Sequence, residues 1–332
     1  MKQFSILDLA PVTEEQSMSQ AIAASVSLAQ HAENLGFHRF WLAEHHNIAG
    51  IASAATAVLI GHIAAATKTM RIGSGGIMLP NHAPLVVAEQ FGTLAAMYPN
   101  RIDLGLGRAP GSDMDTARAL RRNMQAGDQF PDDVVELLHL LGDNPDTAKI
   151  RAFPGEGSHV PVWILGSSLF GAQLAAHLGL PYAFASHFAP AQLEQALHIY
   201  RTTFRPSQWL DAPYAMMAVG VVGAETDEEA HYLHSTQLMS FANVIQGTPG
   251  KLRKPERDVE AHIPAQILAH VKNAMSVSAV GNPDTVQRRL SQIIKQHQPD
   301  EVIMTSMIHD LPARLSSLTI AAAALSSLVT AE

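Results

Sequence analysis

Short apolar segments alternate with longer amphipathic ones along the whole chain, and this alternation restricts the fold more than any other feature. The apolar segments are rich in Ile, Val, Leu, Phe and Trp, whereas apolar residues recur every three to four positions in the longer segments. We therefore expect strands at 4–9, 39–43, 70–75, 102–106, 160–165, 182–185, 214–222 and 301–306. Helices are expected at 17–35, 52–66, 83–97, 113–140, 168–178, 190–204, 226–246, 283–297 and 311–328.

Eight strands, each followed by a helix, are typical of a closed (β/α)₈ TIM barrel, an α/β fold that leaves no sheet edge exposed. A doubly wound open sheet can also hold eight strands, so the count alone leaves both folds open. Polar and glycine-rich residues directly follow five of the strands, at 44–45, 75–76, 107–108, 166–168 and 186–187. Because a barrel collects its chemistry at the carboxyl ends of its strands, this placement favours a single barrel domain over residues 1–332.

The least regular segment is 247–275, which contains three prolines and many charges. Its position after the seventh strand fits a mobile insertion that closes over a site. A solvated loop without a role is the alternative.

Composition excludes several kinds of function. With 47% hydrophobic and 16% charged residues, the chain can bury a large core. Its net charge of −8 and its scattered Lys and Arg argue against a nucleic-acid partner. The absence of cysteine rules out disulfides, thiolate metal ligands and a Cys nucleophile. The sequence shows neither a signal peptide nor a membrane span, so we expect a cytoplasmic protein.

The segment 41–47 places a carboxylate and two imidazoles directly after the second predicted strand. An imidazole titrates near neutrality, so His45 beside a pocket can serve as an acid or a base, with Glu44 next to it. With 17 His in 332 residues, however, roughly one adjacent pair is expected by chance. The motif therefore needs support from other segments.

Two further segments indicate an anion site. Arg108 follows the fourth strand, and its guanidinium can make two parallel hydrogen bonds to a phosphate. Gly166, Ser167 and Ser168 precede a predicted helix, where free N–H groups attract anions. Together they predict a phosphate clamp, although a surface ion pair and a helix cap would explain them separately.

Two patterns remain ambiguous on their own. Gly75 and Gly76 end the third predicted strand, where a backbone without Cβ can approach a flat ligand or simply turn. A metal site could be drawn from Glu44, His45 and His187, with His82, but it lacks the paired-His spacing of barrel hydrolases. We expect no metal.

In order and at family-like spacing, the segments 42–47, 75–80, 101–108 and 166–168 make the chain similar to the bacterial luciferase-like flavin-dependent monooxygenases. The resemblance is continuous from about residue 1 to 190. It implies that FMN lies in the barrel mouth, with its phosphate at Arg108 and Ser168 and its ring against a cis peptide bond at Gly75–Gly76. It also implies an acid/base role for His45. Gly107 stands where luciferase has a cysteine near the flavin.

The resemblance thus implies an enzyme, a luciferase-like monooxygenase that uses reduced FMN and O₂ to oxidise a small organic substrate. A separate flavin reductase would supply the reduced FMN, since no NAD-binding module is visible. F420-dependent hydride transfer and a non-catalytic flavin-binding protein are the alternatives. The resemblance, together with small apolar faces on the helices at 52–66 and 83–97, also favours a homodimer.

Overall fold

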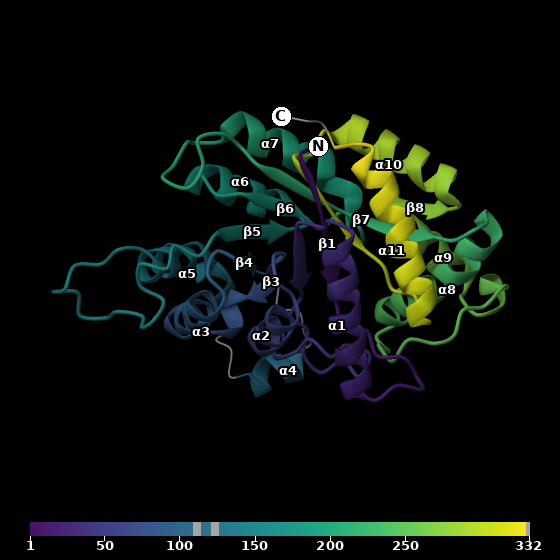
Figure 1. The fold of residues 1–332 in the computed structure, drawn as a ribbon, viewed down its shortest axis with the longest axis horizontal. Coiled ribbons are helices and arrows are strands. Elements are labelled where there is room, and N and C mark those ends of the chain that lie inside the picture. The colour runs from purple at the N-terminus through teal and green to yellow at the C-terminus, as the bar shows by residue number, and fades with distance from the viewer. Residues whose placement is uncertain (109–113, 121–125, 330–332) are drawn as a thin grey trace.

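The structure is a computed structural model that describes residues 1–108, 114–120 and 126–329. Its strands form one parallel sheet that closes on itself, surrounded by helices (Figure 1). The strands are β1 (Gln3–Asp8), β2 (Arg39–Leu42), β3 (Arg71–Met78), β4 (Ile102–Gly107), β5 (Val162–Gly166), β6 (Tyr182–Phe184), β7 (Ala215–Gly223), β8 (Ser278–Gly281) and β9 (Glu301–Thr305).

The helices lie between consecutive strands and cover the outside of the barrel (Figure 1). They are α1 (Met18–Asn34), α2 (Thr56–Ala66), α3 (Pro84–Met97), α4 (Met114–Ala119), α5 (Ala126–Leu141), α6 (Leu169–Leu178), α7 (Leu193–Thr203), α8 (Asp227–Ile245), α9 (Ala265–Ala274), α10 (Pro283–His297) and α11 (Leu311–Ser326). Three 3₁₀ turns, η1 (Leu79–Asn81), η2 (Pro190–Gln192) and η3 (Val259–Ala261), complete the described elements.

All eight predicted strands are present, and the pairing of β6 with β7 closes the barrel, which excludes the open sheet. The strand β8 was not predicted. It pairs with the far end of β7, at Gly220–Gly223, while β9 pairs with the near end, at Met216–Gly220. Where one helix was predicted over 113–140, the structure has α4 and α5, and residues 121–125 between them lie outside the described part.

The predicted insertion at 247–275 contains η3 and α9. An apolar cluster packs α9 onto α8, with Leu268 and Val271 of α9 buried against Leu238 and Met239 of α8. At its start, the backbone of Leu252 forms hydrogen bonds with the β1–α1 loop, donating to Val12 O at 2.9 Å. The insertion is thus attached at both the β1 and the β7 sides of the barrel; its mobility stays a prediction.

Apolar side chains fill the middle of the barrel interior. This inner cluster consists of Leu7, Trp41, Ala43, Trp163, Ala183, Met216, Ala218 and Ile303. The rings of Trp41 and Trp163 meet edge to face, with their centroids 5.2 Å apart. A separate and larger apolar layer joins the strands to the surrounding helices. The inner cluster therefore separates the two ends of the barrel.

A buried ion network occupies the amino-terminal end of the barrel. Asp103, at the start of β4, pairs with Arg39 Nη1 at 2.7 Å and with Arg71 Nη2 at 2.6 Å. Arg39 Nε also lies 3.0 Å from Glu301 Oε1, and the Tyr214 hydroxyl donates to Glu301 Oε2 at 3.0 Å. Each carboxylate thus has charged or hydrogen-bonding partners. This end of the barrel is sealed by mutually satisfied charges.

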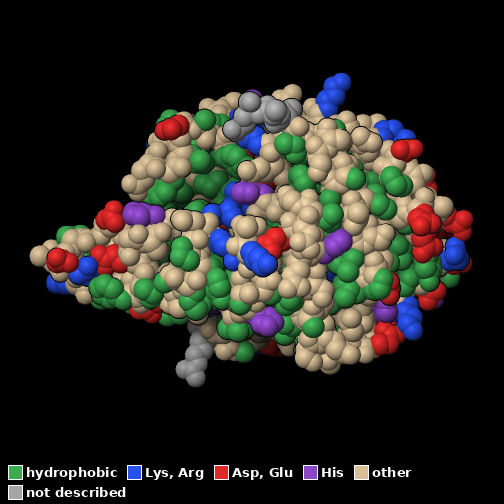
Figure 2. Space-filling view, viewed as in Figure 1, with side chains coloured by type: hydrophobic (Ala, Val, Ile, Leu, Met, Phe, Trp, Pro, Cys, Tyr) green, Lys and Arg blue, Asp and Glu red, His purple; other side chains and the backbone are tan. Residues whose placement is uncertain are grey.

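Within the described residues, every helix is too short or too polar to cross a lipid bilayer. On the face shown in Figure 2, Lys and Arg side chains are interspersed with acidic and apolar ones rather than gathered in one stripe.

Candidate active site

A cavity of about 870 Å³ lies at the carboxyl-terminal end of the barrel. Loops after β2, β4, β5, β6 and β9 line it, together with β3, α8 and the insertion. Its wall is mostly apolar. Of the predicted site residues it contains His45, Gly75, Gly76, Arg108, Gly166, Ser167 and Ser168. The structure therefore brings seven of the eight into one cavity and leaves Glu44 outside its lining.

His45 follows β2 and is half-buried. Its Nδ1 atom is buried and has no hydrogen-bond partner in the described part of the chain. Burial lowers the pKa of His45, and the nearby Glu44 carboxylate, which favours the charged form, does not fully offset this. The imidazole is therefore mainly neutral at pH 7, and no described residue binds its Nδ1.

Glu44 lies outside the cavity lining, in a buried polar cluster. His46 Nε2 is 2.7 Å from its Oε1, and His82 Nε2 is 2.9 Å from its Oε2. The backbone N–H of Met78 also donates to Oε2, at 3.0 Å. Burial would raise the pKa of Glu44, but the hydrogen bonds from His82, His46 and Met78 outweigh it and hold the pKa below its ordinary value. Glu44 thus joins the ends of β2 and β3.

Gly75 and Gly76 lie inside β3, because the strand continues to Met78 where the prediction ended it at residue 75. The peptide bond between them is cis, and the register with β4 shifts at this point. A Cβ on Gly75 would come within 2.8 Å of Leu7 Cδ1, and one on Gly76 within 2.6 Å of Gly105 O. Only glycine fits at position 76, because the contact there is with backbone, whereas a Cβ at position 75 would require the Leu7 side chain to shift. Both residues line the cavity as bare backbone.

Arg108 extends from the end of β4, and its guanidinium carbon lies 4.2 Å from the centre of the Phe170 ring. Among the described residues no carboxylate forms an ion pair with it. Phe170 belongs to the first turn of α6; Ser168 precedes the first residue of this helix, and its side chain makes no capping hydrogen bond. A cation, serine hydroxyls and the amino end of a ten-residue helix therefore line the same cavity. This set fits a phosphate group.

His187 follows β6 and lines the cavity, and its Nδ1 is also buried without a partner among the described residues. Burial and, to a smaller extent, the proximity of His45 lower its pKa to about 4. The two imidazoles thus approach each other, as the metal hypothesis required. His82, however, is held by Glu44, and in the part of the chain that the structure describes no three His, Cys, Asp or Glu are grouped to hold a metal ion.

The sequence reasoning missed the wall that α8 contributes. Gln237, Ser240, Phe241 and Val244 all line the cavity. Their spacing of three, four and seven residues places them on one face of the helix. The signal in the sequence is weak, because Gln237 and Ser240 share this face with Phe241 and Val244.

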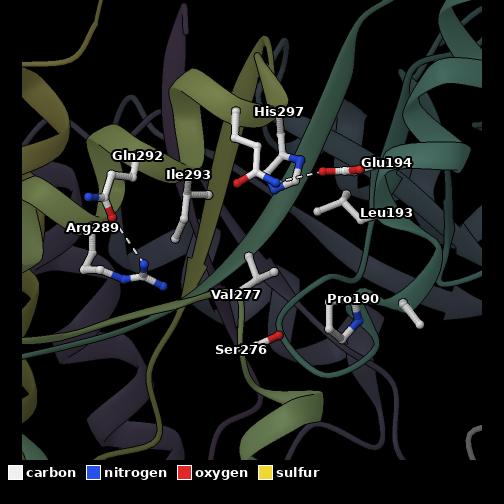
Figure 3. A pocket seen from close by; sticks show the side chains of 11 residues that line it. Pro190, Leu193, Glu194, Ser276, Val277, Arg289, Gln292, Ile293 and His297 are labelled. Carbon is white, nitrogen blue, oxygen red and sulfur yellow. Dashed lines mark hydrogen bonds between the residues drawn. The ribbon is translucent and has the colours of Figure 1, made fainter.

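A second hollow, of about 600 Å³, lies on the outside of the barrel between α7 and α10 (Figure 3). Its polar side chains interact with one another, since Gln296 Nε2 donates to Glu194 Oε1 at 2.7 Å and Arg289 Nη1 to Gln292 Oε1 at 3.2 Å. None of the predicted site residues lines it.

Comparisons with known proteins agree with this geometry. The chain is 49% identical over 319 residues to a luciferase-like monooxygenase of Escherichia coli K12, covering 96% of this chain and 95% of the relative. It is 38% identical over 237 residues to the N-acetyl-S-alkylcysteine monooxygenase of Bacillus subtilis, covering 69% and 70%. The crystal structure of apo-MsnO8 superposes with a TM-score of 0.89 at 33% identity and covers 100% of both chains.

More distant structures share the fold alone. The FMN complex of the oxygenating constituent of 3,6-diketocamphane monooxygenase from Pseudomonas putida has a TM-score of 0.71 at 17% identity, with 100% of both chains covered. An F420-dependent secondary alcohol dehydrogenase has a TM-score of 0.70 at 16% identity, again with 100% covered. The family profile described as luciferase-like monooxygenase matches residues 1–297. This chain belongs to the luciferase-like monooxygenase family.

Proposed function

We propose that this protein is a flavin-dependent monooxygenase that binds reduced FMN and uses O₂ to oxidise a small organic substrate. One observation carries the proposal: a single cavity combines the phosphate-fitting set at Arg108 and α6 with bare backbone at Gly75–Gly76 and an available imidazole at His45. Family membership supports the same reaction class.

In this proposal Arg108, Ser167, Ser168 and the first N–H groups of α6 hold the FMN phosphate, next to Gly166. The flat ring system lies against the backbone of Gly75 and Gly76, which both line the cavity. When bound in its reduced form, FMN supplies the electrons that activate O₂, so that one oxygen atom goes to the substrate and the other to water.

The protein contributes proton transfer and shelter from water. We assign proton exchange with a group in the cavity to the imidazole of His45, which lines the cavity and whose Nδ1 has no partner among the described residues. The apolar wall limits the entry of bulk water. Glu44 assists indirectly, since its bonds to His46, His82 and Met78 fix the loop that carries His45.

We propose the insertion at 247–275 as the mobile part of the site, because Pro249, Gly250 and Met275 contribute to the cavity wall. We also propose a cytoplasmic homodimer that receives its reduced FMN from a separate reductase. Val58 on α2 and Val86 and Met97 on α3 are exposed apolar side chains that suit a subunit interface.

Two alternative functions use the same cavity. The first is hydride transfer with F420, which the shared fold of an F420-dependent dehydrogenase supports. The second is a flavin-binding protein without catalysis, which would use Arg108 and Ser168 and give His45 no role.

The relative named for N-acetyl-S-alkylcysteine makes thioethers the first substrate class to test.

The deciding experiment compares FMN with F420 by titration and by the thermal stabilisation each gives. We expect FMN to bind more tightly. Reduced FMN, a generic flavin reductase and ¹⁸O₂ are then supplied with a panel of thioethers, and we expect a single ¹⁸O atom in the product. Tighter binding of F420, or flavin binding with no labelled product from any substrate class, contradicts the proposal.

A further inference from the structure

The side chain of Gln237 combines deep burial with an unused hydrogen-bonding atom. Gln237 is 6% exposed, lies on α8 and lines the cavity. Its Oε1 atom is buried and receives no hydrogen bond from any residue that the structure describes. Buried acceptors in folded proteins almost always have a partner, and one left without it destabilises the fold. An orphaned acceptor in a cavity wall therefore points to a ligand that donates to it.

The rest of the α8 wall carries no charge, and Ser240 is its only other polar side chain among the described lining residues. Phe241 and Val244 follow Gln237 at positions four and seven along the same face, with Ser240 beside them. Val244 is 52% exposed, and Phe188, which follows β6 and also lines the cavity, is 41% exposed. The cavity mouth thus presents apolar side chains to solvent, which suits an apolar molecule that enters from water.

The part of the cavity wall near the amino end of α6 carries a positive charge, unlike the α8 wall. Arg108 is the only Lys or Arg in the described lining of the cavity, and it lies with the α6 amino end. The two lining histidines are mainly neutral at pH 7, since burial lowers the pKa of both. An anionic ligand therefore has one attractive end of the cavity, and the α8 wall is left for a neutral group.

We propose that α8 carries the substrate subsite, in which Gln237 Oε1 accepts a hydrogen bond from a neutral N–H or O–H group of an otherwise apolar substrate. This inference rests on the proposed function, because it assigns the Arg108 end to FMN. α8 is held in place by its other face, where Leu238, Met239 and Ala242 are buried against α9. Substrate specificity thus depends on a helix rather than on the strand-end loops that would hold the cofactor.

The test uses the full-length protein and a matched pair of probes. One probe is a butyl thioether carrying a secondary acetamide, and the other is the acetate ester of the same shape, in which oxygen replaces the N–H. Calorimetry measures both, with and without oxidised FMN. We expect the amide to bind about tenfold more tightly than the ester, as one hydrogen bond to a buried acceptor provides. In Gln237→Leu the two probes should bind equally.

Gln246→Leu is the matched control, because it makes the same change on an exposed residue at the end of α8, outside the cavity lining. It should keep the tenfold preference, and all three proteins should bind FMN equally. Equal binding of the probes by the wild type, or a preference that survives in Gln237→Leu, overturns the proposal. Failure of FMN to bind with the probe preference intact overturns the proposed cofactor instead.

Stability provides a second readout. Removing an unpartnered buried acceptor should leave the thermal midpoint of Gln237→Leu unchanged or raised. A lowered midpoint means that Gln237 supports the fold, which contradicts its assignment to the substrate. If the Leu variant does not fold, Gln237→Met, which keeps the chain length and flexibility of the side chain, takes its place in the same comparison.

Discussion

The two ends of the barrel differ in whether all of their buried polar groups have partners. At the amino-terminal end, Asp103 and Glu301 are fully buried, and each has partners from the neighbouring strands. At the carboxyl-terminal end, Glu44 and the Asp8–Arg314 pair are also satisfied. In the cavity wall, however, the buried nitrogens of His45 and His187 and the amide oxygen of Gln237 have no partner in the described part of the chain. The inner cluster around Trp41 and Trp163 lies between the two ends.

This difference indicates what each end does. A satisfied charge network fixes the relative positions of strands and leaves nothing for a ligand to bind. Unsatisfied groups weaken the fold unless a ligand completes them, so they persist where binding needs them. We therefore expect changes at the partnered groups to affect stability and changes at the unpartnered groups of the cavity wall to affect activity.

The largest expected effect is on turnover. His45→Ala should slow product formation by ~10²–10⁴, the usual worth of general acid or base catalysis, while FMN affinity and stability stay near wild type. Steady-state product formation with a generic reductase measures the turnover, and flavin titration measures the FMN affinity. His198→Ala, which changes an exposed histidine on α7, is the control and should leave turnover unaltered. Full turnover in His45→Ala means that this histidine only packs.

The next effect concerns stability at the other end. Asp103→Ala leaves Arg39 and Arg71 without their shared carboxylate and should lower the free energy of unfolding by ~3–5 kcal/mol. Urea unfolding measures this. Asp146→Ala, whose side chain is 96% exposed in its pair with Arg151, should cost at most ~1 kcal/mol. If the free energy of unfolding falls by the same amount in both variants, the buried ion network does not stabilise the barrel.

The third effect is on cofactor affinity. Arg108→Ala removes a charge-assisted contact worth ~1.5–3 kcal/mol and should weaken FMN binding about 10- to 100-fold. Riboflavin lacks the phosphate, so its affinity should not change between wild type and variant. Arg118→Ala, an exposed arginine on α4, is the control. An equal loss for FMN and riboflavin places the phosphate away from Arg108.

The barrel could be predicted because each of its eight strands is apolar enough to read as buried on both faces. The short β8 could not be predicted, because four residues give too little pattern. It pairs with the last residues of β7, beyond the part of β7 that pairs with β9. Helix periodicity likewise continues across 113–140 without showing that α4 and α5 are separate.

The site residues at strand ends could be predicted, because parallel strands deliver their carboxyl ends to one side of the barrel. Glu44 and His45 were grouped by adjacency, but neighbouring side chains on an extended backbone point in opposite directions. His45 therefore enters the cavity, whereas Glu44 turns toward His82. Gln237 was missed because its role depends on how α8 lies over the barrel, which is a tertiary property.

The smallest effect tests whether Glu44 stabilises the fold, like the partnered groups at the amino-terminal end, or takes part in catalysis. Its folded pKa lies below the ordinary value of 4.5, so its stabilisation is present above pH 4.5 and is lost as the pH falls through the folded pKa. Glu44→Gln should lower the free energy of unfolding by ~1–2 kcal/mol at pH 7, the worth of charged hydrogen bonds to His46 and His82. The difference should shrink below pH 4.5, in unfolding curves measured across the acid range. Turnover should stay within a few-fold of wild type; a loss as large as that of His45→Ala would return Glu44 to the catalytic role that its place in the sequence indicated.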